Sequence, residues 1–229
     1  MALPKGAVIG GIVAVLVGGA VWMQTQSSGF SDVKSNSYNM KEVPRHPVTD
    51  AMASTAKAQK GKPAPEFKLP DSEGAEKTLA DIRGGKPGVL VMTKDGCPCS
   101  IESQPFFNKI AEHYQERAAF LGIIDADSQA GKKYKTDFSV PYPMLSNTEI
   151  EVFKQYQAKQ SVYIFLISAD GTLEHVWPGY SKSMLEDLNA KLAAASDMPA
   201  AQLDLNMAPE EMTSGCYFFK PVGTEEPAW

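Results

Sequence analysis

The chain has few residues of the kinds that build disulfide-rich or nucleic-acid-binding proteins. It contains 3 cysteines in 229 residues, which excludes a scaffold held together by several disulfides. Its net charge is -5, and its lysines and arginines form no cluster, so we expect no nucleic-acid surface. We find no internal repeat. The odd number of cysteines leaves one thiol free, paired between chains, or exchanging with the other two.

An uncharged apolar run occupies residues 6–23, with Lys5 before it and polar residues after it. As a helix it would be about 27 Å long, enough to cross the hydrocarbon core of a bilayer. We therefore predict a single-pass anchor over residues 1–24 in the inner (cytoplasmic) membrane, with the remaining chain periplasmic or extracytoplasmic. A cleavable signal peptide ending near residues 18–20 is the alternative. No cysteine follows the run, so we expect no lipoprotein anchor.

Small residues recur every four positions along this predicted anchor. They are Gly6, Gly10, Ala14 and Gly18. Such a stripe lets a second transmembrane helix approach the backbone closely, which predicts a partner helix in the membrane. Short anchors also often contain glycine and alanine without any partner, and this alternative stays open.

The remaining chain divides into three parts. Residues 25–61 are rich in Ser, Gln, Lys and Ala and predict an extended linker. Residues 62–195 carry the apolar periodicity of a folded domain. Its predicted strands are 89–93, 119–124, 162–168 and 172–177, and its predicted helices are 101–117, 128–137, 148–158 and 183–195. This order predicts an α/β fold, a central mixed sheet with helices on both faces. Residues 196–229 form an extended tail that either packs back on the domain or binds another molecule.

The strand over residues 89–93 ends in a short loop that carries Cys97 and Cys99, and a helix follows at once. A helix N-terminus presents unpaired N–H groups and a partial positive charge, which stabilise a thiolate over a thiol. Because the thiolate is the nucleophile, this arrangement predicts a reactive cysteine.

Three sequence blocks together resemble the redoxin group of the thioredoxin-fold superfamily. This group includes peroxiredoxin-like proteins and membrane-tethered periplasmic thiol-disulfide oxidoreductases. The first block, GKPAPEFKLPD from Gly61, looks like the opening hairpin of the family. The second, from Gly85 through CPCS to Pro105, looks like its active-site strand and helix. The third, FLISADG ending at Gly171, looks like a later strand and turn.

The resemblance implies a thioredoxin-like fold and assigns roles to the cysteines. The family's pattern is Cys-x-x-Cys with a proline eight residues after the first cysteine, and Pro105 lies eight residues after Cys97. Cys97 therefore matches the attacking cysteine, whereas Ser100 stands at the usual resolving position. Cys99 comes one residue early, and a Cys-x-Cys disulfide closes a small ring that should be easily reduced. Lys94 is expected to lower the pKa of Cys97 by its charge.

Several positions depart from the family pattern. Val162 stands where the family has a cis-proline, and a cis bond is not expected there without proline. Lys94 replaces the threonine of peroxiredoxins and no arginine follows Arg117, which argues against peroxidase activity. The copper-chaperone branch would need a histidine where Gln160 stands, so we expect no metal site.

Cys216 lies in the tail, where it either resolves the chemistry of Cys97 and Cys99 or remains an isolated thiol. Two functions follow. The first is thiol-disulfide exchange by Cys97, with Cys99 or Cys216 resolving, Lys94 assisting and no cofactor. The second is a non-catalytic accessory subunit of a larger respiratory or photosynthetic membrane complex, which uses the fold as a scaffold.

Overall fold

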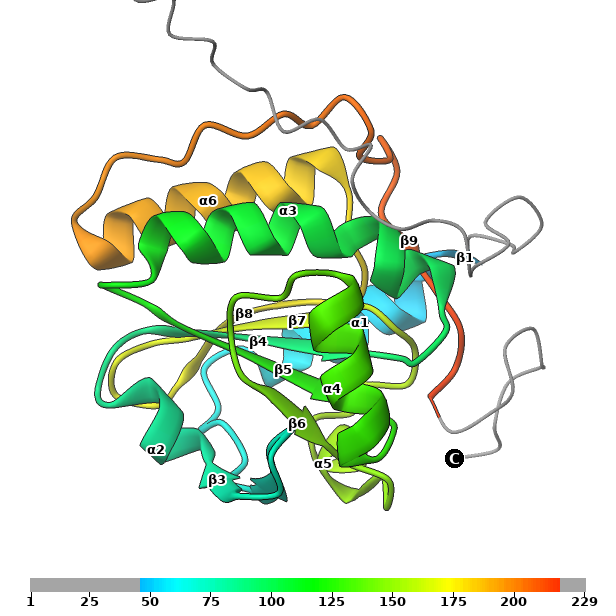
Figure 1. The fold of residues 1–229 in the computed structure, drawn as a ribbon. Coiled ribbons are helices and arrows are strands. Elements are labelled where there is room, and N and C mark those ends of the chain that lie inside the picture. Colours follow the sequence, from blue (N-terminus) through cyan, green and yellow to red (C-terminus); the bar gives the residue numbers. More distant parts are fainter. Residues whose placement is uncertain (1–45, 219–229) are drawn as a thin grey trace, which may run out of the picture.

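A computed structural model describes residues 46–218, which form a five-stranded mixed sheet covered by helices (Figure 1). The strand order is β6-β5-β4-β7-β8, where β4 pairs in parallel with β5 and antiparallel with β7. The strands of this sheet are β4 (Gly88–Thr93), β5 (Ala119–Ile124), β6 (Met144–Ser146), β7 (Tyr163–Ile167) and β8 (Leu173–Trp177). The short strands β2 (Lys68–Pro70) and β3 (Glu76–Thr78) form a separate hairpin.

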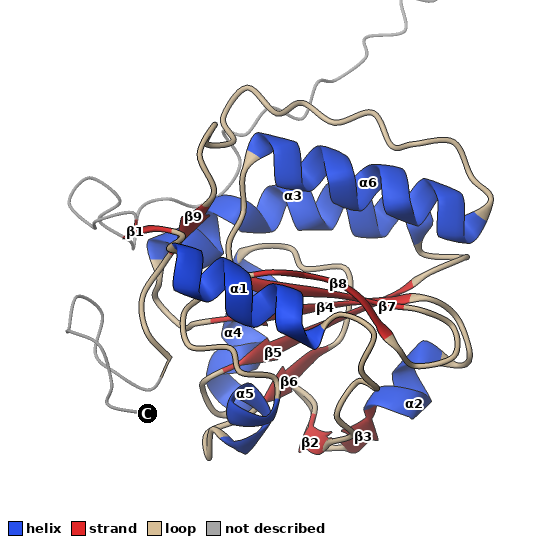
Figure 2. Cartoon of the chain, turned by 180° about the vertical axis from the view of Figure 1, so that it is seen from behind, coloured by secondary structure: helices blue, strands red, loops and turns tan. Residues whose placement is uncertain are grey.

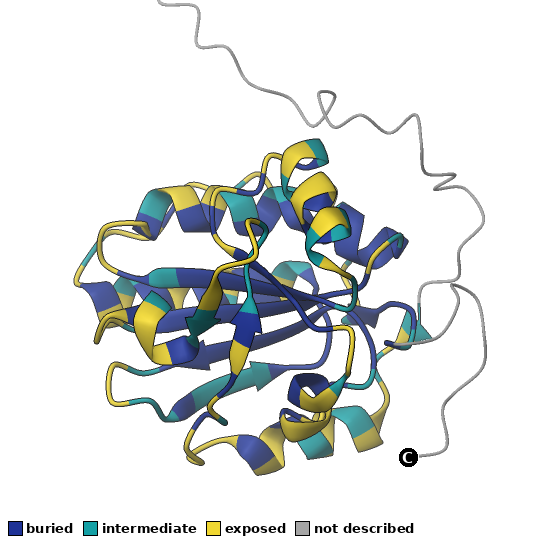
Figure 3. Ribbon diagram, turned by 60° about the horizontal axis from the view of Figure 1, so that its bottom comes forward, coloured by how far each residue is buried: buried dark blue, intermediate teal, exposed yellow. Residues whose placement is uncertain are grey.

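Alternate residues of the central strands point to opposite faces of the sheet and divide the core in two. In β4, Val89 and Val91 belong to one apolar cluster, whereas Leu90 and Met92 belong to the other. Every residue of β4 and β7 is buried, as the dark central strands of Figure 3 show. Strands that are covered on both faces are continuously apolar, which explains why these strands were visible as apolar runs in the sequence.

The helices divide between the two faces. They are α1 (Asp50–Gln59), α2 (Leu79–Arg83), α3 (Pro98–Tyr114), α4 (Ser128–Asp137), α5 (Glu151–Gln155) and α6 (Lys182–Ser196). Residues of α3, α4 and α6 pack into the first cluster, whereas residues of α1, α2 and α5 pack into the second. Figure 1 shows α3 beside α6 above the sheet, and Figure 2 shows α1 from the opposite side. The predicted α/β fold with helices on both faces is thus confirmed.

Part of the segment predicted as an extended linker is folded. Residues 46–61 contain β1 (His46–Pro47) and the ten-residue helix α1. The hydroxyl of Thr49 accepts a hydrogen bond from the Met52 amide and caps the helix, and Ala56 and Gln59 are buried. The composition suggested a linker because the helix has only a weak apolar stripe; packing against β8 stabilises it instead.

The predicted membrane anchor over residues 1–24, with its stripe of small residues, lies outside the described residues. Within residues 46–218, no helix is both long enough and apolar enough to cross a bilayer.

The tail packs back on the domain as far as residue 218. After α6, residues 198–212 run along α3 and α6, and Met198, Leu203 and Leu205 pack against the first cluster (Figure 1). The chain then forms β9 (Thr213–Ser214), which pairs with β1. The tail thereby joins the N-terminal part of the described chain.

Asn189 fastens the tail to α6. Its side-chain amide donates to the carbonyl of Ala201 at 2.8 Å and accepts from the amide of Ala201 at 2.9 Å. The hydroxyl of Tyr114 also donates to it, at 2.7 Å. One buried side chain therefore connects α3, α6 and the tail.

We predict that Asn189→Ala lowers the free energy of unfolding by about 2 kcal/mol, because the buried backbone groups of Ala201 lose their partners. Urea denaturation measures this loss. The control is Ala190→Ser on the exposed side of the same helix, which should change the free energy by less than about 0.5 kcal/mol. A loss equally small for Asn189→Ala would contradict the assigned role.

Candidate active site around Cys97

Cys97 lies between the end of β4 and the start of α3. It is the N-cap residue of α3, and Pro98 takes the first helical position, where a missing N–H costs no hydrogen bond. The hydroxyl of Ser100 accepts a hydrogen bond from the backbone amide of Lys94 at 3.0 Å. Ser100 stands at the position of the family's resolving cysteine, and its hydrogen bond stabilises the loop that holds Cys97.

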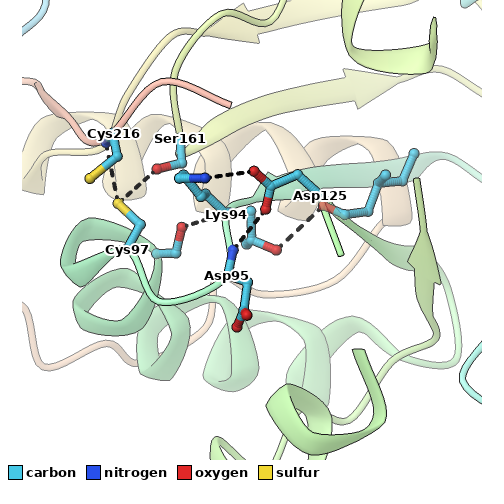
Figure 4. Close-up of polar contacts among 9 residues, drawn as sticks. Lys94, Asp95, Cys97, Asp125, Ser161 and Cys216 are labelled. Carbon is cyan, nitrogen blue, oxygen red and sulfur yellow. Dashed lines mark hydrogen bonds and ion pairs between the residues drawn. The ribbon is translucent and has the colours of Figure 1, made fainter. Parts of the chain in front are cut away.

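Two donors from distant parts of the chain converge on the sulfur of Cys97. The hydroxyl of Ser161, just before β7, donates to Sγ at 2.9 Å, and the amide of Cys216 donates to it at 3.3 Å (Figure 4). Cys97 is 0% exposed, so these bonds act without competition from water. The fold thus places two hydrogen-bond donors, the Ser161 hydroxyl and the Cys216 amide, around the sulfur of Cys97. We call these two donors the cradle, because together they stabilise a thiolate.

Hydrogen bonding separates the pKa values of the neighbouring cysteines. The side chain of Cys216 and then that of Cys99 donate to Cys97, and together with the Cys216 amide and Ser161 they lower the pKa of Cys97 far below that of an ordinary thiol. The pKa of Cys99 is raised, first by its hydrogen bond to Cys97 and then by burial. The electron-rich sulfur of the pair is therefore Cys97, and the proton stays on Cys99.

The tail brings the third predicted cysteine to the same place. Cys216 is 5% exposed, and Sγ of Cys99 lies 3.3 Å from the neighbouring carbonyl of Ser214. None of these three cysteines is part of a disulfide. Cys97, Cys99 and Cys216, which are separated by up to 119 positions in the chain, thus form one buried cluster.

Lys94 is held by another partner. Its ammonium forms a buried ion pair with Asp125 at the end of β5, with 2.9 Å between Nζ and Oδ2 (Figure 4). The other oxygen of Asp125 accepts from the amide of Asp95 at 2.9 Å. The charge of Lys94 is therefore largely neutralised, and its clear contribution is to fix the loop before Cys97.

The segment opposite Cys97 corrects one expectation. The peptide bond between Ser161 and Val162 is cis, although no proline is present and a trans bond was expected. The prediction from residue type alone was wrong because the surrounding structure, here the neighbouring tail and β7, determines the conformation of this loop.

Sequence reasoning did not find Ser161, Asp125 or Gly215. A serine and a glycine are too common to stand out, and nothing in their spacing connects them with residue 97. Asp125 directly follows a predicted strand parallel to β4, so its position at the same sheet edge as Lys94 was a signal that could have been used.

His113 and His175 have partners other than the cysteines. Nε2 of His113 lies 2.9 Å from the carbonyl of Pro199, and His175 stacks on Trp177. Gln160 donates its side-chain amide to the carbonyl of Gly215 at 3.3 Å. Among residues 46–218, no group of three or more histidine, cysteine or acidic side chains has the arrangement of a metal site.

This fold and site define a thioredoxin-like protein of the redoxin superfamily. A crystal structure of an uncharacterized conserved protein from Geobacillus kaustophilus shares the fold, with a TM-score of 0.58 and 22% identity over 72% of this chain and 94% of that one. The family model of the AhpC/TSA family matches residues 60–176, and the chain belongs to that family.

Two relatives represent different branches of this superfamily. A Helicobacter pylori protein named putative peroxiredoxin bcp is 27% identical over 150 residues, which cover 58% of this chain and 99% of that protein. A Bacillus cereus protein named thiol-disulfide oxidoreductase ResA is 28% identical over 144 residues, which cover 61% of this chain and 82% of that protein. The similarity is nearly equal, so the site itself must distinguish between the two chemistries.

We predict that Ser161→Ala raises the pKa of Cys97 by about 1 to 2, because a hydrogen bond to a charged group contributes about 1.5–3 kcal/mol. The ultraviolet absorbance of the thiolate, followed against pH, reports this pKa without requiring a reagent to reach the buried sulfur. The absorbance change of the variant should occur at higher pH than that of wild type, and Cys97→Ser identifies the change that belongs to Cys97. Ser103→Ala, which removes a buried hydroxyl that donates to the Ser100 carbonyl, is the control. An unchanged profile for Ser161→Ala would refute the cradle.

Proposed function

We propose that the chain catalyses thiol-disulfide exchange, with Cys97 as the nucleophile and Cys99 as the resolving thiol. The observation that carries this proposal is the convergence of the Ser161 hydroxyl and the Cys216 amide on the Cys97 sulfur at the start of α3. A thiolate held in this way is both populated at neutral pH and positioned at a helix N-terminus.

The reaction proceeds in two exchanges. The Cys97 thiolate attacks one sulfur of a substrate disulfide, the S–S bond breaks, and the leaving thiolate takes a proton from solvent. Cys99 then loses its proton and attacks the Cys97 sulfur, which releases the second substrate thiolate. The substrate gains two electrons, and a Cys97–Cys99 disulfide forms. The small ring of a Cys-x-Cys disulfide favours easy reduction, so the same steps in reverse oxidise a dithiol.

The site supports exchange better than peroxide reduction. Lys94 takes the position of the peroxiredoxin threonine, and Asp125 neutralises its charge. The donors to Cys97 come from a serine and from a tail amide, and neither is an arginine that would polarise a peroxide.

We place this chemistry on the periplasmic or extracytoplasmic side of the inner membrane, with residues 1–24 as the anchor. The uncharged run over residues 6–23 supports this placement, and so does Lys5 before it. A partner helix at the Gly6, Gly10, Ala14 and Gly18 stripe would recruit the domain to a membrane complex.

The first test is a redox titration of the full chain in detergent, with thiol alkylation read by mass spectrometry. We expect a reversible Cys97–Cys99 couple between about -270 and -120 mV, the range of working oxidoreductases. Cys97→Ser should abolish exchange with a disulfide substrate, whereas Cys99→Ser should accumulate the mixed disulfide at Cys97. Cysteines that form no defined pair, or turnover that survives Cys97→Ser, would sink the proposal.

A second candidate function is a non-catalytic subunit of a membrane complex. The burial of all three cysteines favours it, because a protein substrate has no direct access to Cys97, which is 0% exposed, while the tail is in place. We expect a complex larger than the monomer in native-size separation of mild detergent extracts. Gly10→Leu together with Ala14→Leu should release the chain from it, with Val13→Leu as the matched control. A wild-type chain that migrates only as a free monomer would exclude this function.

A further inference from the structure

After β9, the tail pairs with residues 159–161 directly against the site. The amide of Ser161 donates to the carbonyl of Cys216 at 3.0 Å, and the amide of Phe218 donates to that of Lys159 at 3.0 Å. The amide of Gly215 donates to the carbonyl of Ser161 in the opposite direction. Together with the antiparallel bridge between Gln160 and Tyr217, these bonds pair the tail with the backbone edge of residues 159–161. Sheet edges bind extended peptides by backbone hydrogen bonds of the same kind.

Glycine is required at position 215 because the strand passes so close to the sulfurs. A Cβ there would lie 2.5 Å from Sγ of Cys97, 2.8 Å from Oγ of Ser161 and 2.9 Å from Cβ of Cys99. Real Cβ atoms do not approach other atoms so closely. Any strand that occupies this edge in the same way must carry glycine immediately before its cysteine.

Two residues further along, Phe218 anchors the strand. It is 1% exposed and packs on Phe153 of α5, with the ring centroids 4.2 Å apart. Residues i and i+2 of an extended strand face the same side, so Cys216 and Phe218 both point into the protein. Tyr217 between them borders a cavity of about 440 Å³, whose lining includes Tyr163 and Met52.

We propose that residues 213–218 are a tethered substrate strand. They occupy the edge at which a protein substrate presents its cysteine, and they compete with that substrate for Cys97. The proposal rests on the exchange function and names its substrate class: extended segments with the pattern Gly-Cys-x-aromatic, in which the cysteine is part of a disulfide.

The tethered strand explains how the buried thiol of Cys97 can have a low pKa and still be unreactive towards external substrates. The strand supplies the Cys216 amide that helps to hold the thiolate, and it also covers the sulfur. A segment attached by a short connection competes at an effective concentration in the millimolar range. A free peptide at micromolar concentration should therefore react only after the tail is displaced.

The chemical step needs no additional oxidant. A peptide with the tail sequence MTSGCYF, activated as its 2-pyridyl disulfide, reacts when the Cys97 thiolate attacks the peptide sulfur. The S–S bond breaks, pyridinethiolate leaves with the electron pair, and Cys97 carries the peptide as a mixed disulfide. The released pyridinethione gives the rate.

The test compares the full wild-type chain with Gly215→Val, in which the tail cannot take its place. We expect Gly215→Val to react with the activated peptide at least about tenfold faster than wild type. A second peptide, with valine in place of its glycine, should react at least about tenfold more slowly with Gly215→Val than the first. Met207→Gln, a change at the exposed residue Met207 in the same tail, is the control and should match wild type.

The outcomes separate this proposal from the exchange function. If wild type and Gly215→Val exchange equally fast, the tail is not a competitor, and the proposal fails while the exchange function stands. If the variant loses its preference for the glycine peptide, the substrate class is wrong. If Gly215→Val exposes Cys97 to iodoacetamide but no disulfide reacts, the exchange function fails, and the tethered substrate fails with it.

Hydrogen exchange tests the proposal without any change at Gly215. In wild type, amides of residues 213–218 should exchange slowly, and Phe218→Ala should accelerate them because the ring anchor is lost. A peptide with serine in place of cysteine binds without covalent chemistry. At millimolar concentration it should accelerate exchange of the same tail amides, whereas its valine counterpart should not. The proposal is wrong if these tail amides exchange quickly in wild type. It is also wrong if neither peptide changes their exchange rate.

Discussion

The site depends on the pairing of Ser161 with the tail. Ser161 uses its backbone to hold residues 215 and 216, and it uses its hydroxyl to hold the sulfur of Cys97. The same contact that seats the tail therefore completes the cradle around the thiolate. Because the cluster is buried, each donor is worth more than it would be in water, and the loss of any one leaves a poorly solvated charge.

The charged side chains near this contact pair with each other rather than with the cysteines. Lys94 and Asp125 form a buried ion pair, so Lys94 places no unpaired positive charge beside the cysteines. The thiolate is then stabilised by hydrogen bonds and by the start of α3 rather than by a neighbouring cation. Stabilisation by hydrogen bonds depends on where the donors lie, and one of these donors is the tail amide of Cys216. The position of the tail therefore determines both access to Cys97 and the pKa of Cys97.

The regular elements were largely predictable, whereas the site was only partly so. The apolar runs of β4, β5 and β7 and the periodicity of α3, α4 and α6 gave their positions within a few residues, because buried strands and amphipathic helices leave a local pattern. Helix α1 was missed since its stability comes from packing rather than from its own apolar stripe. Cys97 and Cys99 were visible as a motif, but the chemical role expected for Lys94 did not include its partner Asp125, which lies on another strand.

The sequence by itself determined the fold class, the strand-loop-helix that carries Cys97 and Cys99, and the long uncharged run before the domain. These are properties of neighbouring residues, and short-range sterics and hydrophobic periodicity are sufficient to encode them. Only the tertiary structure decided that Cys216 and Gly215 lie on Cys97, that Lys94 faces Asp125, and that the peptide before Val162 is cis. Each of these depends on contacts between segments that are distant in the chain, and such contacts leave no periodic trace in the sequence.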